Sequence, residues 1–152
     1  MTRESEKDAL HHALLDLVGI FTRPQPDEKL LEEAGVSLDR ALFPLLVRIG
    51  LYQPIGVAEL AELVGRDHST VSRQLGKLET LGLVQRKACG DDQRIRQAKV
   101  TAKGRKMVAA ISVARRRIFD DIQKDWSAQD RAQLTRLVRR LADGMRETLV
   151  QR

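Results

Sequence analysis

Residues 57–101 read VAELAELVGRDHSTVSRQLGKLETLGLVQRKACGDDQRIRQAKVT, and their pattern is the most informative about the fold. Two short amphipathic helical patterns meet at Gly65. An alternating segment, a charged turn and a second alternating segment follow them. The order helix, turn, helix, strand, turn, strand predicts a winged helix-turn-helix.

The turn between the two helices has the residue types that a helix-turn-helix requires. Ala61 is small where the helices cross, Gly65 stands in the turn, and Val71 lies where the second helix packs on the first. Glycine readily adopts the positive φ that such a turn often needs. Asp67, His68 and Ser69 are the candidates for the cap of the second helix.

The second helix divides into two faces. At about 100° per residue, Val71, Leu75 and Leu78 form the buried face. The opposite side has neither an acid nor a large apolar residue, and it carries Ser69, Thr70, Ser72, Arg73, Gly76, Lys77 and Thr80. Hydroxyls reach phosphates or base edges, and arginine binds guanine through two hydrogen bonds. This composition predicts DNA contact, because a merely solvated face usually mixes Glu with Lys.

The wing is expected to have strands over 83–88 and 97–100, with Ala98 and Val100 turned inward. Residues 89–96 are expected to form the loop between them. Arg94 near the tip is placed to enter a minor groove, and Asp92 to orient it by a carboxylate–guanidinium pair. A solvent-exposed charged hairpin is the alternative.

Positive charge is concentrated on this segment. Residues 66–106 hold 11 Lys and Arg against 4 Asp and Glu, a balance of +7. The balance is −5 over residues 1–65 and +4 over residues 107–152. Because the excess is local, it indicates a polyanionic partner rather than general solubility.

Helical patterns flank the winged segment. They are expected over 4–22, over 28–34 capped by Asp27 and ended by Gly35, over 38–50 capped by Ser37, from Thr101 onward, and from Ser127 to about 150. Pro24 and Pro26 are expected to make a linker, and Gly50 and Pro54 to close the third helix. The first and last helices carry apolar stripes that the winged lobe does not need. A second copy of the chain is the expected partner, and a monomer whose terminal helices fold back is the alternative.

The predicted fold is therefore mostly α with a small β-wing: a winged helix-turn-helix flanked by N- and C-terminal dimerisation helices. Residues 1–36 form the N-terminal dimerisation helix and linker. Residues 37–101 form the DNA-binding lobe, and residues 102–152 form the C-terminal dimerisation helices.

Two motifs carry a family resemblance. Asp92-x-Arg94, followed by Ala98-x-Val100–Thr101 and Lys103–Gly104, resembles the wing signature of the MarR (multiple antibiotic resistance regulator) family. The stretches STVSR (69–73) and LExLGLVxR (78–86) resemble its recognition helix and first wing strand. One departure is Ala98, where the family usually has a larger aliphatic residue, which would loosen the wing packing slightly.

The resemblance implies a homodimeric regulator, usually a repressor, that binds a pseudo-palindromic operator in double-stranded DNA and is released by a ligand. The predicted DNA-binding residues are His68, Ser69, Thr70, Ser72, Arg73, Lys77, Arg86, Asp92, Arg94 and Arg96. By the same analogy, a small aromatic or anionic effector is expected in a cleft, with His11, Arg23 and Arg48 as candidate lining residues.

Other signals are weaker. Cys89 lies beside Arg86 and Lys87, basic neighbours that favour a reactive thiolate, so a redox-responsive regulator is an alternative. Adjacent His11 and His12 point to different helix faces and do not suit one metal ion, so no metal site or cofactor is expected.

Further function classes are disfavoured. The sequence lacks a Gly-rich phosphate loop and a nucleophile–His pair, which argues against an enzyme. A winged-helix protein-interaction module would need an apolar or acidic outer face, which the second helix lacks. No apolar run approaches a membrane span, and the N-terminus precedes no signal-type segment, so a cytoplasmic protein without a membrane partner is expected.

Overall fold

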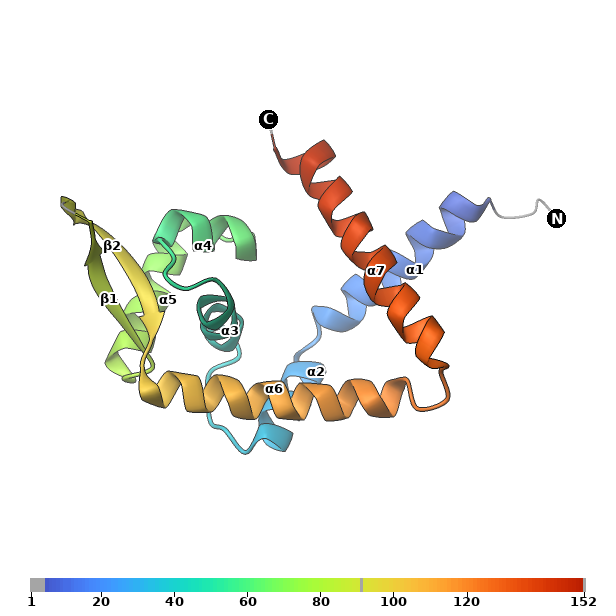
Figure 1. Cartoon of the computed structure of the whole chain (residues 1–152), viewed down its shortest axis with the longest axis horizontal. Helices are drawn as coiled ribbons and strands as arrows, with labels where there is room; N and C mark the ends of the chain where they lie inside the picture. The colour runs from blue at the N-terminus through green and yellow to red at the C-terminus, as the bar shows by residue number, and fades with distance from the viewer. Residues whose placement is uncertain (1–4, 91, 152) are drawn as a thin grey trace. The chain divides into compact units, whose positions relative to one another are not determined.

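The computed structural model describes residues 5–90 and 92–151 (Figure 1), and along the wing the side chains of residue 89 and residues 92–95 lie outside this description. The chain forms two compact units, Met1–Arg115 and Arg116–Arg152, with the boundary inside one long helix. The elements are α1 (Glu6–Phe21), α2 (Pro24–Ala34), α3 (Phe43–Tyr52), α4 (Val57–Val64), α5 (His68–Thr80), β1 (Val84–Cys89), β2 (Asp92–Val100), α6 (Ala102–Ile122), α7 (Ala128–Met145) and the π-helical turn η1 (Arg146–Val150).

The core of the first unit joins α3, α4, α5 and the hairpin, which Figure 1 shows in green and yellow. Leu45, Leu46 and Ile49 of α3 are fully buried against Leu60 of α4. Aliphatic side chains supply this core, as the low aromatic content of 3% requires. The predicted winged helix-turn-helix and the mostly helical fold class are confirmed.

A second, smaller cluster extends the core beyond the winged segment. Leu31 of α2, Phe43 of α3 and Ile111 of α6 pack together, with Ile111 fully buried. Both α2 and the first part of α6 therefore belong structurally to the winged unit. The assignment of residues 1–36 and 102–152 to dimerisation concerns a second chain and stays a prediction.

The hairpin has longer strands than the alternation indicates. β1 and β2 are antiparallel with Val84 opposite Val100 and Ala88 opposite Arg96. The loop predicted over 89–96 is wrong, because β2 already begins at residue 92. Gly90 has φ 63°, a left-handed conformation that lets the chain reverse directly after β1.

The outer edge of β2 is also covered, which the sequence patterns do not reveal. Ile55 forms an isolated bridge with Ala98, with N–O distances of 2.7 and 3.2 Å, and the Gln53 side chain accepts a hydrogen bond from Val100 N at 3.0 Å. Ala98 and Val100 are 1% and 2% exposed, which confirms their inward orientation. The small Ala98 side chain is part of the buried core cluster.

Two predicted helix starts are wrong. α2 begins at Pro24, because a proline fits the first helical turn, so Pro24 and Pro26 do not form a linker and Asp27 is not a cap. Asp27 instead accepts a hydrogen bond from Arg40 Nε at 2.9 Å. The following helix, α3, begins at Phe43 with Pro44 in its first turn, and Ser37 does not cap it.

The end of α3 also differs from the expectation. Gly50 does not close the helix, which continues to Tyr52. Gly50 instead allows α6 to approach, because a Cβ there would lie 3.3 Å from Val108 Cγ1. The predicted end of α2 is confirmed by Gly35, whose φ is 66°.

The second unit contains the end of α6, α7 and η1. Ser127 caps α7 as predicted, since its Oγ accepts a hydrogen bond from Asp130 N at 3.0 Å. No residue of α7 is buried, and Leu137 and Val138 are 48% and 51% exposed. Over the described part of the chain, no helix combines the length and apolarity needed to cross a membrane.

The junction between the wing and α6 depends on close backbone approach. Thr101 Oγ1 donates to Gly82 O at 2.6 Å and accepts from Gly104 N at 3.0 Å, as predicted for the cap of this helix. A Cβ at Gly104 would overlap the carbonyl oxygen of Leu83, which itself accepts from Thr101 N at 3.0 Å. The start of α6 therefore rests directly on the chain that enters β1.

We expect Gly104→Ala to lower the free energy of unfolding by about 1–3 kcal/mol, because neither backbone can move without breaking these hydrogen bonds. Gly76→Ala is the matched control. A Cβ at Gly76 meets nothing within 4 Å, so the added methyl should stabilise α5 by about 0.5–1 kcal/mol. Urea unfolding of both variants measures the difference, and an unchanged Gly104→Ala midpoint would contradict the assigned contact.

Candidate nucleic-acid interface

The N-terminus of α5 is organised by Asp67, which is the helix cap. Its Oδ1 accepts hydrogen bonds from Thr70 N at 2.8 Å and Ser69 Oγ at 2.7 Å, and its Oδ2 accepts from Thr70 Oγ1 at 2.7 Å. The hydrogen bond from the Ser69 hydroxyl, followed by those from Thr70, holds the pKa of Asp67 well below its usual range. The carboxylate is therefore ionised throughout the neutral pH range.

The two faces of α5 lie as the periodicity predicts. Val71, Leu75 and Leu78 are at most 1% exposed and pack in the core. Of the predicted DNA-binding residues on α5, His68, Ser69, Arg73 and Lys77 are exposed, and Thr70 and Ser72 are half-buried. Arg73 Nη2 lies 3.4 Å from Thr70 Oγ1. The exposed face thus combines hydroxyl groups with two cationic side chains.

A polar contact missed by sequence reasoning joins α5 to the turn before α3. Arg66 Nη1 donates to Gln74 Oε1 and to Ala41 O, both at 2.8 Å. Gln74 is thereby held sideways on α5 and tied to the turn before α3. An arginine directly after the turn glycine is the only sequence signal for this contact, and its partners are distant in the chain.

Arg86 points toward α5. Its Nε lies 2.8 Å from Glu79 Oε1, an ion pair without hydrogen-bond geometry at Nε, and its Nη2 donates to Ser72 O at 3.1 Å. The Arg86 side chain is only 21% exposed. It links the first wing strand to the recognition helix.

The wing places the remaining predicted residues differently. Arg96 is exposed on β2, with its Nη2 3.5 Å from Arg86 O. The side chains of Asp92 and Arg94, on which the predicted wing contact depends, lie outside the described residues. So does the thiol of Cys89, the candidate redox group.

The described pocket that Arg23 lines contains neither of the other two candidate effector residues. Arg23, at the cap of α2, lines a shallow pocket with Ile20, Pro24, Gln25, Pro26 and Lys29. Neither His11, exposed on α1, nor the half-buried Arg48 of α3 is among its lining residues.

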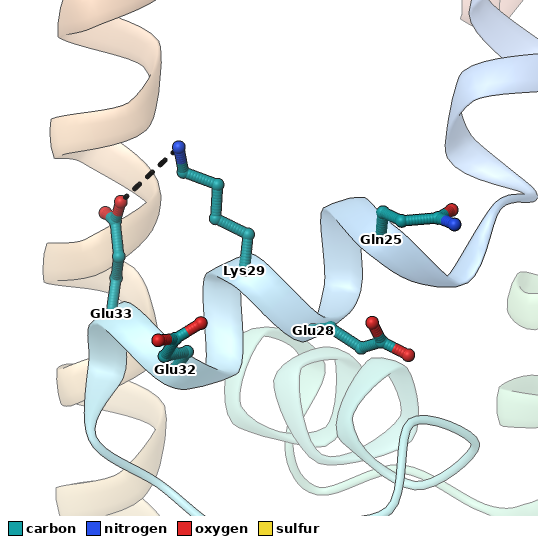
Figure 2. Close-up of a pocket in the computed structure, with 5 residues that line it drawn as sticks. All are labelled: Gln25, Glu28, Lys29, Glu32 and Glu33. Atoms are coloured by element: carbon teal, nitrogen blue, oxygen red, sulfur yellow. Dashed lines mark ion pairs between the residues drawn. The ribbon is translucent and has the colours of Figure 1, made fainter.

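Figure 2 shows a neighbouring pocket along α2, lined by Gln25, Glu28, Lys29, Glu32 and Glu33. Lys29 Nζ lies 4.0 Å from Glu33 Oε1 there. Three carboxylates against one lysine make this pocket unsuited to an anion.

No cluster of three His, Cys, Asp or Glu side chains that could hold a metal ion is present among the described residues. The His11 and His12 rings are 6.1 Å apart and tilted by 48°.

Comparison with known proteins agrees with this geometry. Residues 38–95 match the MarR family. The uncharacterized HTH-type transcriptional regulator YxaD of Bacillus subtilis (strain 168) is 30% identical over 110 residues, which cover 72% of this chain and 77% of YxaD. The crystal structure of MarR is similar with a TM-score of 0.70 and 26% identity, covering 89% of this chain and 98% of that one.

A further solved structure shares the fold. It is a putative MarR family transcriptional regulator from Listeria monocytogenes complexed with 26mer DNA, with a TM-score of 0.74 and 22% identity over 88% of this chain and 89% of that one. MarR family members are transcription regulators and not enzymes. From the family match, the YxaD identity and the recognition-helix geometry, we conclude that this chain belongs to the MarR family of DNA-binding winged-helix transcriptional regulators.

Proposed function

We propose that the chain acts as a homodimeric repressor that binds a pseudo-palindromic operator and is released by a small aromatic or anionic ligand. The observation that carries this proposal is the exposed face of α5, where Ser69, Arg73 and Lys77 are accessible and no acidic residue interrupts them. A helix with such a face can enter the major groove. Repression is the simplest outcome, because a dimer covering its operator excludes other proteins from it. A cytoplasmic location, where bacterial-type regulators meet DNA, is part of the proposal.

The proposed contacts follow from exposure and chemistry. Arg73 suits a guanine edge through two hydrogen bonds, and Lys77 suits a phosphate as a point charge. His68 and Ser69 lie at the helix end that reaches base edges first. Arg96 on β2 suits a phosphate, and the wing contact of Arg94 supported by Asp92 stays part of the proposal on sequence grounds alone.

Arg86 has a different proposed role within the same interface. Its guanidinium is already engaged by Glu79 and by the carbonyl oxygen of Ser72. We infer that it holds α5 against β1, so that it positions the reading face without reaching the bases. Thr70 and Ser72, both half-buried, are also more restricted than their exposed neighbours.

The dimer is proposed from apolar surface that each unit leaves exposed. On α1, Leu10, Leu17, Val18 and Phe21 are 49–65% exposed and none of the helix is buried. On α7, Leu134, Leu137, Val138 and Met145 are 39–51% exposed. Large exposed apolar stripes of this kind usually mark an interface, and two-fold pairing is the commonest way to cover them.

An effector pocket is proposed near Arg23. That pocket combines two cations, Arg23 and Lys29, with the apolar side chains of Ile20, Pro24 and Pro26. An aromatic carboxylate would match both properties, with its ring on the prolines and its charge on the arginine. The acidic pocket of Figure 2 would repel the same ligand.

Arg73→Ala tests the reading face. We expect operator affinity to fall about tenfold to a hundredfold in fluorescence anisotropy, because one bidentate base contact is lost. Arg131→Ala, which removes an exposed arginine from α7, is the matched control and should leave affinity unchanged. Affinity that does not respond to salt would instead favour a protein-interaction module, since phosphate contacts make DNA binding weaken with salt.

Leu137→Asp tests the dimer. Placing a charge in the α7 stripe should convert the wild-type dimer to a 17.1 kDa monomer in light scattering, because the carboxylate would be buried unpaired. Leu81→Asp alters a comparably exposed leucine at the C-cap of α5 and should leave the mass at the dimer value. A monomeric wild-type protein at micromolar concentration would refute the proposed dimer.

Arg23→Ala tests the effector pocket. Benzoate should raise the Tm of the wild-type protein and weaken its DNA binding, since binding to the folded state stabilises it by about 2.7 kcal/mol at a hundred times Kd. Arg23→Ala should abolish both effects, whereas Lys7→Ala, an exposed cation on α1, should not. Equal responses in the two variants would remove Arg23 from the proposed site.

A further inference from the structure

Two hydroxyl groups on the reading face have their hydrogen-bond polarity set before DNA is present. Ser69 Oγ donates to Asp67 Oδ1, and Thr70 Oγ1 donates to Asp67 Oδ2, each at 2.7 Å. An ionised carboxylate can only accept, and a hydroxyl has one proton and two lone pairs. Both hydroxyl protons are therefore used within the protein, and only oxygen lone pairs remain for an outside partner.

This restriction changes what Ser69 can recognise. Its side chain is exposed at the start of α5. A hydroxyl that only accepts cannot donate to a phosphate oxygen, and the neighbouring Asp67 charge repels phosphate as well. In the major groove, the hydrogen-bond donors on base edges are the adenine N6 and cytosine N4 amino groups. Ser69 is thus matched to an amino group and mismatched to guanine O6 and N7 and to thymine O4.

Because Thr70 donates its proton to Asp67, its hydroxyl oxygen is an acceptor for Arg73. Thr70 Oγ1 donates to Asp67 and lies 3.4 Å from Arg73 Nη2, which is placed to donate to it. The sequence of groups is carboxylate, hydroxyl, guanidinium, with each hydrogen bond running toward Asp67. Holding the guanidinium in this way reduces the side-chain entropy that Arg73 would lose on binding.

We propose that Asp67 is a specificity-determining positioning residue, which makes the Ser69 and Thr70 hydroxyls acceptors and so directs the N-terminal end of α5 to an adenine or cytosine amino group. The proposal rests on the proposed operator binding by α5. It adds the chemical class of the base edge that this end of the helix selects. Asp67 itself touches no base, and acts through its two hydroxyl partners.

Asp67→Asn separates this role from helix capping. Asparagine caps helices about as well as aspartate, because its Oδ1 accepts the same backbone hydrogen bond. The substitution replaces Oδ2 with an NH₂ group, which faces Thr70 Oγ1 as a donor and frees the threonine proton. The remaining Oδ1 is neutral and holds the Ser69 proton less firmly than a carboxylate does, so Ser69 can then donate as well as accept. The fold is kept while the polarity of both hydroxyl groups changes. Glu62→Gln on α4 removes one exposed negative charge without touching these hydroxyls, and is the charge control.

The measurement is selection of bound duplexes from random DNA, followed by anisotropy on selected and scrambled duplexes. For wild type we expect an adenine or cytosine at one half-site position to be preferred about tenfold. Asp67→Asn should lose that preference at this position, with the wild-type helix content in circular dichroism and no weaker binding to scrambled DNA. Glu62→Gln should keep it.

A double-substitution cycle with Thr70→Val identifies the route of the effect. If Asp67 acts through Thr70, Asp67→Asn should add little to the loss of Arg73-dependent affinity already caused by Thr70→Val. Fully additive losses of affinity would overturn the inference. It would also be overturned if the Asp67→Asn variant kept the same base preference as the Glu62→Gln variant. A uniform loss of affinity together with a loss of helix content would show a structural cap alone. Absence of sequence-specific binding by wild type would instead overturn the proposed function itself.

Discussion

The burial of one face of α5 is the constraint on which the rest of this molecule depends. Val71, Leu75 and Leu78 are each at most 1% exposed, and burying a side chain of this size is worth about 1.5–3 kcal/mol. Because these residues recur every three or four positions, only one rotation of the helix satisfies all of them. That rotation turns Ser69, Arg73 and Lys77 outward. Burial of the apolar face therefore determines the direction in which the polar face of α5 points.

Polar contacts restrict the position of α5 further than burial alone does. Arg66 joins Gln74 to the turn before α3, and Arg86 joins Glu79 and the Ser72 carbonyl to β1. These arginines lie on either side of α5 and use directional interactions, so they fix its position more narrowly than nonpolar packing can. At the N-terminus of α5, Asp67 determines the hydrogen-bond polarity of the Ser69 and Thr70 hydroxyls.

Helices α1 and α7 differ from α5, because their apolar stripes are exposed. Their leucine and valine stripes have the spacing of buried helix faces, yet neither helix has a buried residue. In a single chain, an apolar stripe of this kind has a favourable free energy of burial still available. The proposed two-fold dimer would bury these stripes and so gain that free energy. It would also present two copies of α5 to the two halves of an operator.

Much of the fold was accessible from sequence, because local periodicity and glycine chemistry act over a few residues. Gly65, with φ 66°, Thr101 and Ser127 stand at the helix boundaries where they were expected. The failures at Ser37, Asp27 and residues 89–96 share a cause. At each, two local signals competed: Pro24 and Pro44 suit a first helical turn as well as a break, and Gly90 permits a tighter reversal than the charged run implied.

The order of elements, the two faces of α5 and the concentration of charge beside them can be predicted from the amino-acid sequence, since each is a property of neighbouring residues. Three contacts depend on the folded chain: Arg86 turns inward to Glu79, Arg66 reaches Ala41, and Ile55 covers the edge of β2. These contacts join residues far apart in the chain, and their geometry depends on how the helices pack. The hydroxyl protons of Ser69 and Thr70 belong to the same class: the residues are visible in the sequence, but their hydrogen-bond polarity exists only once Asp67 adopts its position at the start of the helix.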